Sequence, residues 1–113
     1  MNTRLVLVKL TADSMEDHPG ADWHHRVRDM ITDIARDERV GAESVELFWT
    51  LGPFDAIVRI VVPSDAAAVA FSLTLGRKLR AATTTLTELT EADMDVALEV
   101  TEGMNGPLRA DST

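Results

Sequence analysis

The sequence contains no cysteine and no tyrosine, and its aromatic residues are two tryptophans and three phenylalanines among 113 positions. The absence of cysteine excludes disulfide bonds, a thiolate nucleophile and cysteine-ligated zinc or iron–sulfur centres. Glycine-rich nucleotide-binding loops, the nucleophile elbow of hydrolases and the HExxH zinc motif are also absent. We therefore expect no nucleotide or dinucleotide cofactor and no metal site.

Long apolar runs are absent as well. The run Leu5–Val8 ends at Lys9 and is shorter than the ~7–15 residues of a signal-peptide core. No stretch approaches the ~20 apolar residues that cross a bilayer. These absences predict a cytoplasmic protein that has no membrane partner.

The net charge of −8 is unevenly distributed along the chain. Residues 1–87 carry 12 acidic and 10 basic residues, a net of −2, whereas residues 88–113 carry seven acidic residues and one basic residue, a net of −6. Neither part supplies the basic patch that nucleic acids or anionic membranes require. We therefore expect no nucleic-acid partner.

Hydrophobic periodicity predicts four strands and three helices. The expected strands are residues 4–10, 44–51, 56–62 and 80–89, and the expected helices are residues 21–39, 65–75 and a short segment after Thr90. Residues 11–20 are polar and are predicted to be a loop, and Gly76 is predicted to end the second helix. The last helix opens on a sequence that resembles a capping box, with Thr90 as N-cap and Asp93 three residues later. Three of its residues are expected to face inward, namely Met94, Ala97 and Leu98.

This order of elements is typical of the ferredoxin-like βαββαβ fold, an α+β arrangement with a four-stranded antiparallel sheet and two helices on one face. A chain of this length fits one domain, which we place at residues 1–102 with a flexible tail at residues 103–113. In three of the four strands the residues are apolar on both faces, although two helices can cover only one face. Because a second copy is the simplest cover for the other face, the sequence predicts a homodimer or a higher oligomer.

The run Thr50–Val58, TLGPFDAIV, resembles the signature of the GYD-domain family, in which a threonine-leucine-glycine step precedes an aromatic residue, an aspartate and a strand. Three later segments are also similar to that family, namely Val62–Asp65, Ala82–Leu86 and Thr90–Met94. The resemblance covers roughly residues 44–98. It implies a dimeric α/β-barrel, in which two ferredoxin-like sheets pack face to face, and no particular activity. Phe54 stands where the family has tyrosine, so no phenolic hydroxyl is available there.

The segment Gly52–Asp55 has two interpretations. As a hairpin turn, it uses the positive φ that glycine permits, the fixed φ of Pro53 and an Asp55 side chain that bonds nearby backbone N–H groups. As a site, it places Phe54 and Asp55 at the rim of a pocket, with Asp55 as a base or a ligand anchor. The turn is the commoner use of such residues.

Charged residues inside predicted strands are candidates for ligand binding. Lys9 and Arg59 each share a strand face with apolar residues. Such a charge must be paired, must reach solvent near a strand end, or must line a wet cavity. If Arg59 faces the space between two sheets, it would orient an anionic or carbonyl-bearing ligand.

The aromatic residues are candidates for a ligand cavity or for the core. Phe48 and Trp49 are adjacent strand residues and point to opposite faces, so one of them meets the dimer side. Trp23 and Phe71 lie on helix faces that we expect to pack on the sheet. His24 flanks the apolar stripe of the first helix and is a candidate catalytic residue, whereas the adjacent histidine points away, so the two cannot share one metal ion.

These features leave three classes of function open. The first is a small-molecule-binding or accessory protein that holds a partly apolar ligand between sheet and helices. Its expected ligand-binding residues are Arg59, Trp49, Phe54, Phe48 and Lys9. The alternative is a cofactor-independent enzyme, such as an isomerase, cyclase or monooxygenase, that uses the same cavity with His24 or Asp55 as the catalytic residue. The third is a structural module with a filled barrel.

Overall fold

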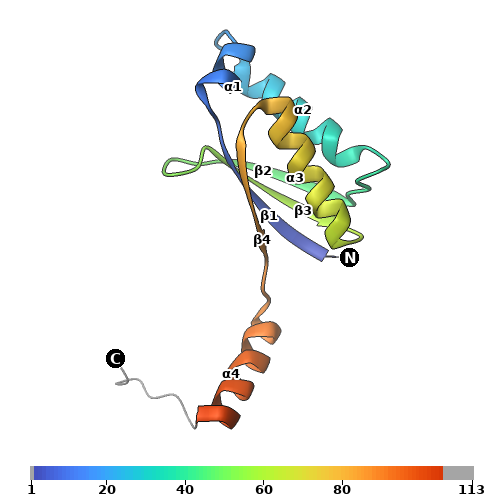
Figure 1. The fold of residues 1–113 in the computed structure, drawn as a ribbon, viewed down its shortest axis with the longest axis vertical. Coiled ribbons are helices and arrows are strands. Elements are labelled where there is room, and N and C mark those ends of the chain that lie inside the picture. Colours follow the sequence, from blue (N-terminus) through green and yellow to red (C-terminus); the bar gives the residue numbers. More distant parts are fainter. Residues whose placement is uncertain (1, 106–113) are drawn as a thin grey trace.

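The computed structural model describes residues 2–105 as four strands and four helices. In chain order these are β1 (Asn2–Lys9), α1 (Ala12–Asp17), α2 (Trp23–Arg36), β2 (Ser44–Trp49), β3 (Ala56–Val62), α3 (Asp65–Leu79), β4 (Ala82–Thr87) and α4 (Glu91–Asn105). The strands form one antiparallel sheet in the order β2-β3-β1-β4. Helices α2 and α3 cover one face of the sheet, and α4 extends away from it (Figure 1). The predicted ferredoxin-like α+β fold is confirmed.

The hydrophobic core fills the layer between the sheet and helices α2 and α3. Alternate residues of β1 and β3 point into this layer and are fully buried, among them Val6, Val58 and Ile60. Phe71 projects into the same layer from α3 and is also fully buried, as expected for this residue. Trp23 is partly buried against the same core. Buried side chains therefore fill the space between sheet and helices in which the sequence placed a ligand.

On the other side of the sheet, which we call the open face, none of the helices in the described part of the chain packs (Figure 1). Residues on this face alternate with the buried ones along each strand. They are Thr3, Leu5, Leu7 and Lys9 of β1, Ser44, Glu46 and Phe48 of β2, Ile57, Arg59 and Val61 of β3, and Ala82, Thr84 and Leu86 of β4. The larger apolar ones are concentrated on the two central strands, β1 and β3, so the prediction of strands that are apolar on both faces is correct for these two strands.

Helix α1 is the element that the sequence prediction missed, since residues 11–20 were expected to be a loop. Thr11 and Ser14 form a reciprocal capping box, in which each side chain accepts from the other residue's backbone N–H. The Thr11 hydroxyl also donates to the Arg80 carbonyl at 2.7 Å, and the Arg80 guanidinium donates two hydrogen bonds to Asp17. These contacts fix α1 on the end of α3, because a short helix needs such partners.

Helix α3 continues past Gly76, so the prediction that this glycine ends the helix is wrong. Leu75 and Leu79 lie one turn apart and are both fully buried, which favours a helix that reaches Leu79. Gly76 serves a different purpose: a Cβ at this position would lie 3.4 Å from the Ala81 carbonyl oxygen. The helix ends at Arg80, whose φ of 53° is left-handed.

Helix α4 differs most from its prediction. The capping box is present, because Thr90 N donates to Asp93 at 2.9 Å and Asp93 N donates to the Thr90 hydroxyl at 3.1 Å. The helix continues through Gly103 to Asn105, and the rest of the expected tail, residues 106–113, lies outside the described residues. Met94, Ala97 and Leu98 do not face inward: all residues from Glu91 to Val100 are exposed.

None of the helices in residues 2–105 combines the length and the apolar character needed to cross a bilayer.

Two leucines of α3 provide a matched test of the core. Leu75 is fully buried, whereas Leu73, two residues away in the same helix, is 58% exposed. We expect Leu75→Ala to lower the free energy of unfolding by about 3–5 kcal/mol, because it leaves a cavity in the core. Leu73→Ala should change it by less than about 1 kcal/mol. Urea denaturation of both variants measures the difference, and equal losses would contradict the assigned core.

Candidate functional site

Arg59 lies near the centre of the open face. It is the middle residue of β3, with Glu46 opposite it on β2 and Leu5 opposite it on β1. Leu5 is in turn opposite Leu86 on β4. One row of side chains therefore crosses all four strands, with a single cation in it.

Two carboxylates bind the Arg59 guanidinium from opposite edges of the sheet. Its Nη1 donates to Glu46 Oε1 at 3.2 Å, and its Nε donates to Glu88 Oε2 at 3.0 Å. Glu88 follows β4, and its backbone N–H donates to the Thr3 carbonyl. The Arg59 side chain thus reaches across β1, and Glu46, Arg59 and Glu88 form a belt over the sheet. The hydrogen bond to Glu88 is the main reason why the pKa of Arg59 is raised above its ordinary value.

The charge of the belt limits the kinds of ligand that it can bind. One guanidinium and two carboxylates leave a net charge of −1, so the belt repels an anion. The sequence allowed Arg59 to orient either an anionic or a carbonyl-bearing ligand. The arrangement favours the second, because a guanidinium has five N–H donors. Those on Nη2 have no partner among residues 2–105, so they can donate to a neutral carbonyl or hydroxyl oxygen.

Apolar side chains lie beside the belt. The next row of the open face contains Phe48, Ile57, Leu7 and Thr84. Phe48 is 49% exposed and Leu86 is 43% exposed, and the apolar residues between them on β1 and β3 are half-buried. Phe48 lies on the open face and Trp49 on the helix side, as their adjacent positions predict. This surface can hold an apolar group next to a hydrogen-bond donor.

A hollow of about 370 Å³ opens at the other side of the belt. Arg59 and Glu88 line it together with Thr3 and the first turn of α4, where Thr90 and Asp93 lie. The hydrogen bonds from Thr90 lower the pKa of the Asp93 carboxyl. The volume is within the ~300–1,000 Å³ of ordinary ligand pockets. The sequence did not predict this hollow, because nothing local in it indicates that residues 2–4 lie beside residues 87–93.

Trp49 and His24 lie on the opposite side of the sheet from Arg59, in an aromatic cluster at the start of α2. The Trp23 and Trp49 rings meet edge to face with centroids 5.4 Å apart, and His24 lies 6.5 Å from Trp49. The Nε1 atom of Trp49 is buried and has no hydrogen-bond partner within residues 2–105. The predicted ligand residue Trp49 and the catalytic candidate His24 are therefore near each other, and neither faces the belt.

Asp55 has the contacts of a turn residue. Its carboxylate accepts from the backbone N–H of Leu10 at 2.7 Å and lies 3.9 Å from the Lys9 ammonium. Its own N–H donates to the Val8 carbonyl. Asp55 thus joins the β2–β3 turn to the end of β1. The half-buried Phe54 lies beside it in the turn, and its carbonyl accepts from the Thr50 hydroxyl at 2.8 Å.

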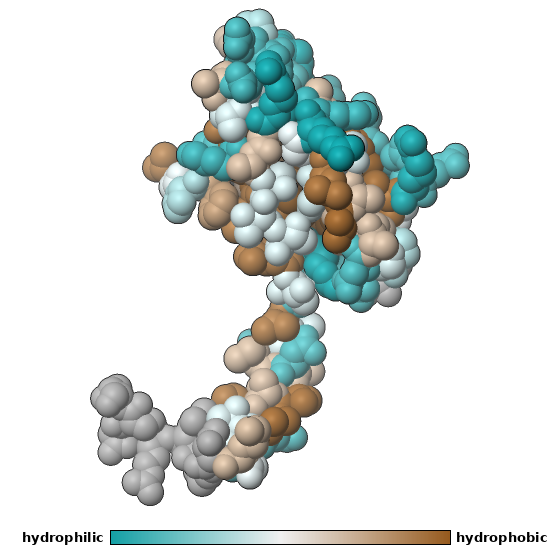
Figure 2. All heavy atoms as spheres, viewed as in Figure 1, coloured by the Kyte–Doolittle hydropathy of each residue, from teal (hydrophilic) through white to brown (hydrophobic). Residues whose placement is uncertain are grey.

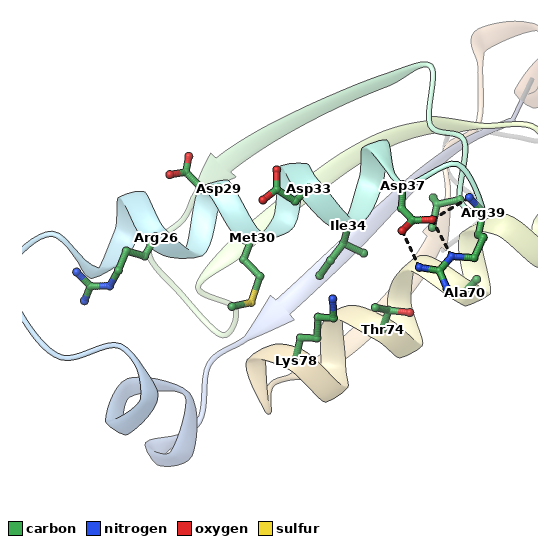
Figure 3. A pocket seen from close by; sticks show the side chains of 11 residues that line it. Arg26, Asp29, Met30, Asp33, Ile34, Asp37, Arg39, Ala70, Thr74 and Lys78 are labelled. Atoms are coloured by element: carbon green, nitrogen blue, oxygen red, sulfur yellow. Dashed lines mark hydrogen bonds and ion pairs between the residues drawn. The ribbon is translucent and has the colours of Figure 1, made fainter.

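A second groove lies on the outer surface of the helix layer, between α2 and α3 (Figure 3). It encloses about 830 Å³, and none of the predicted site residues lines it. Met30 and Ile34 supply apolar walls, while the carboxylates of Asp29 and Asp33 lie along α2 and Lys78 faces the groove from α3. The four-residue spacing of the aspartates was the available signal. Three basic residues, Arg26, Arg39 and Lys78, balance the three aspartates of the lining, so the groove has no net charge.

The described residues contain no group of three or more histidine, aspartate or glutamate side chains placed to hold a metal ion. The predicted site residues fall into three places: Arg59, Phe48 and Lys9 on the open face, Trp49 and His24 on the helix side, and Phe54 and Asp55 in the turn. The belt is the place where charge, apolar surface and a hollow come together.

Comparison with known proteins agrees with the resemblance found in the turn and the later segments. No curated protein and no solved structure matches the chain. The family model described as GYD domain matches residues 5–98, which run from the middle of β1 through β4 to the first half of α4. The chain therefore belongs to the GYD domain family.

Proposed function

We propose that the protein is a homodimer that binds a small, partly apolar and uncharged molecule on the open face, beside Arg59. The observation that supports this most directly is a mainly apolar sheet face with one arginine, held by two carboxylates, at its centre. Apolar side chains provide affinity without direction, and a fixed donor provides orientation. Membership of the GYD domain family agrees with the fold and leaves the ligand open.

The proposed dimer follows from the exposure of the open face. Monomeric proteins rarely expose contiguous apolar patches larger than a few hundred Å². A second copy placed face to face would cover the patch on both chains at once, with the same surface used twice around a two-fold axis. The two belts would then line a chamber between the sheets, which gives a ligand water-excluded walls.

A binding protein fits the arrangement better than an enzyme. His24 and Arg59 lie on opposite sides of the sheet, and the Asp55 carboxylate is engaged by the Leu10 N–H. An acid–base pair has to reach the same reacting atom within about 3 Å. The candidates for catalysis do not meet at one place, whereas the candidates for binding do.

Two glutamate substitutions test the proposed interface, one on the open face and one on the exposed side of α3. Leu7→Glu should raise the dissociation constant of the dimer by about 100-fold or more, because an unpaired carboxylate would be buried between the sheets. Leu73→Glu makes the same change on the exposed side of α3 and should leave the constant within about threefold. Sedimentation velocity measures both. A monodisperse monomer of the unmodified protein at micromolar concentration, or a dimer that persists in Leu7→Glu, would refute the interface.

Two dyes test the charge preference of the belt. Nile red is apolar, neutral and bears a carbonyl, whereas anilinonaphthalene sulfonate is apolar and anionic. We expect the neutral dye to bind the unmodified protein more tightly, and Arg59→Met to weaken its binding by about tenfold through loss of a hydrogen bond to a charged donor.

Glu88→Gln is the matched variant for the same experiment. It removes one negative charge from the belt and keeps the shape, so it should raise the affinity for the anionic dye by a few-fold or more. Fluorescence titration gives both affinities, and native mass spectrometry of the purified protein detects any ligand that it retains. Equal binding of the two dyes in all variants would show that the belt does not select the ligand.

A further inference from the structure

Helix α4 is an amphipathic helix on which no other element of residues 2–105 packs. Its larger apolar residues are Met94, Val96, Leu98, Val100 and Met104. At 100° per residue, these and Ala97 cover about 200° of the helix surface, and Glu91, Asp95, Glu99 and Glu102 gather in the remainder. The fifth acidic residue, Asp93, lies within the apolar sector at the start of the helix, where the capping box holds its side chain. Figure 2 shows apolar and hydrophilic atoms side by side on the α4 surface, away from the rest of the molecule.

A helix in this position needs a surface to pack on. Isolated helices of about 12–15 residues are marginal in water, and most helical stability in proteins comes from packing of an apolar face. The exposed fractions of the five larger apolar residues of α4 range from 42% at Leu98 to 77% at Met104. The capping box at Thr90 starts the helix but buries none of this surface.

The open face of the same chain is out of reach of α4. Only Glu88–Thr90 separate β4 from α4. The Glu88 N–H is bonded to Thr3, and Thr90 is held in the capping box. As a result α4 continues beyond the end of β4, away from the sheet (Figure 1).

We infer that α4 is an exchanged arm whose apolar face packs on the open face of a second copy, next to the belt. This inference rests on the proposed homodimer and adds to it a second contact. The partner's sheet then covers most of the open face, the part next to the belt covers the apolar face of α4, and the assembly closes around one two-fold axis. Because Thr90 and Asp93 line the hollow beside Arg59, docking of α4 also fixes one wall of that hollow.

Charge favours the body of the second copy over its α4 as the partner. Residues 91–105 contain five acidic residues and no basic residue, whereas on the open face Lys9 and Arg59 balance Glu46 and Glu88. Two α4 helices packed on each other would bring like charges together, at a cost that the body does not impose.

The size of the exposed apolar surface also supports the body of a second copy as the partner of α4. The exposed apolar surface of Leu89 and α4 is on the order of 600 Å², and the open face adds to it, so the two together meet the roughly 800 Å² per partner of a stable interface.

Two aspartate substitutions in the full chain test the arm. Val100→Asp places a charge in the apolar sector of α4, and we expect it to raise the dissociation constant of the dimer at least tenfold. Ala92→Asp adds the same side chain on the acidic side of the first turn, where the helix dipole favours it, and should leave the constant within about threefold. Sedimentation velocity reports the assembly, and circular dichroism reports whether α4 stays helical.

The absence of cysteine allows a direct test of the location. Protein carrying Val100→Cys is mixed with protein carrying Leu86→Cys or Phe48→Cys, each a single thiol in an otherwise cysteine-free chain. A short bismaleimide should join the α4 thiol of one copy to the open-face thiol of the other. Cross-links only between two α4 thiols, or cross-links in a double variant only within one chain, would overturn the arm.

The two proposals fail separately. If Leu7→Glu dissociates the dimer and Val100→Asp does not, the open face is the interface and the arm is refuted. If Val100→Asp dissociates the dimer while Leu7→Glu does not, α4 docks elsewhere, and both the arm on the open face and the sheet interface are refuted. Dissociation by both variants with the expected cross-link supports the two together.

Discussion

The structure depends on one imbalance: the strands are apolar on both faces, and the helices that pack on the sheet cover only one. On the covered side, β1 and β3 supply fully buried valines and isoleucines against α2 and α3. On the open side, Phe48 and Leu86 remain nearly half exposed. The hydrophobic effect that builds the core therefore also leaves an unsatisfied surface of similar character. The proposed dimer, ligand site and α4 arm all follow from that surface.

The belt makes this surface more than an apolar patch. Two carboxylates surround Arg59, and their hydrogen bonds satisfy part of its donor capacity while making the local charge negative. An arginine alone would attract carboxylates and phosphates in general. An arginine that is already neutralised selects instead for groups that accept a hydrogen bond without adding charge. Burial between two sheets strengthens this selection, because an unpaired charge is costly in a low-dielectric space.

The sequence predicts the fold well because the strands and helices are local patterns with strong periodicity. β3 occupies the predicted residues 56–62, and the opposite orientation of Phe48 and Trp49 follows from the alternation of a strand. Helix α1 was missed because its six residues contain only two apolar side chains, Ala12 and Met15, and show no apolar period, although Thr11 and Ser14 carried a capping signal. The end of α3 was misplaced because Gly76 is there for close approach to Ala81 rather than for a turn.

The site was less predictable, since it depends on contacts between distant segments. The strand period placed Arg59 and Glu46 on one face, but Glu88 follows another strand and reaches Arg59 only across β1. Met94 and Leu98 were expected to be buried because apolar helix residues usually pack on their own chain. That expectation fails where a short linker directs the helix away from the sheet. Periodicity identifies the apolar face of a helix but does not identify the surface that this face contacts.

The path of the Arg59 side chain has a mechanical consequence. Strands β2 and β4 are the two edges of the sheet and share no backbone hydrogen bond. Through Glu46 and Glu88, one guanidinium ties the margins of the sheet together across its full width. Twisting of the sheet displaces its edges relative to each other, so this side chain acts as a strap that limits the twist. A molecule that breaks one of these hydrogen bonds would remove this limit on the twist. Ligand binding at the centre of the sheet would then change the positions of both edge strands.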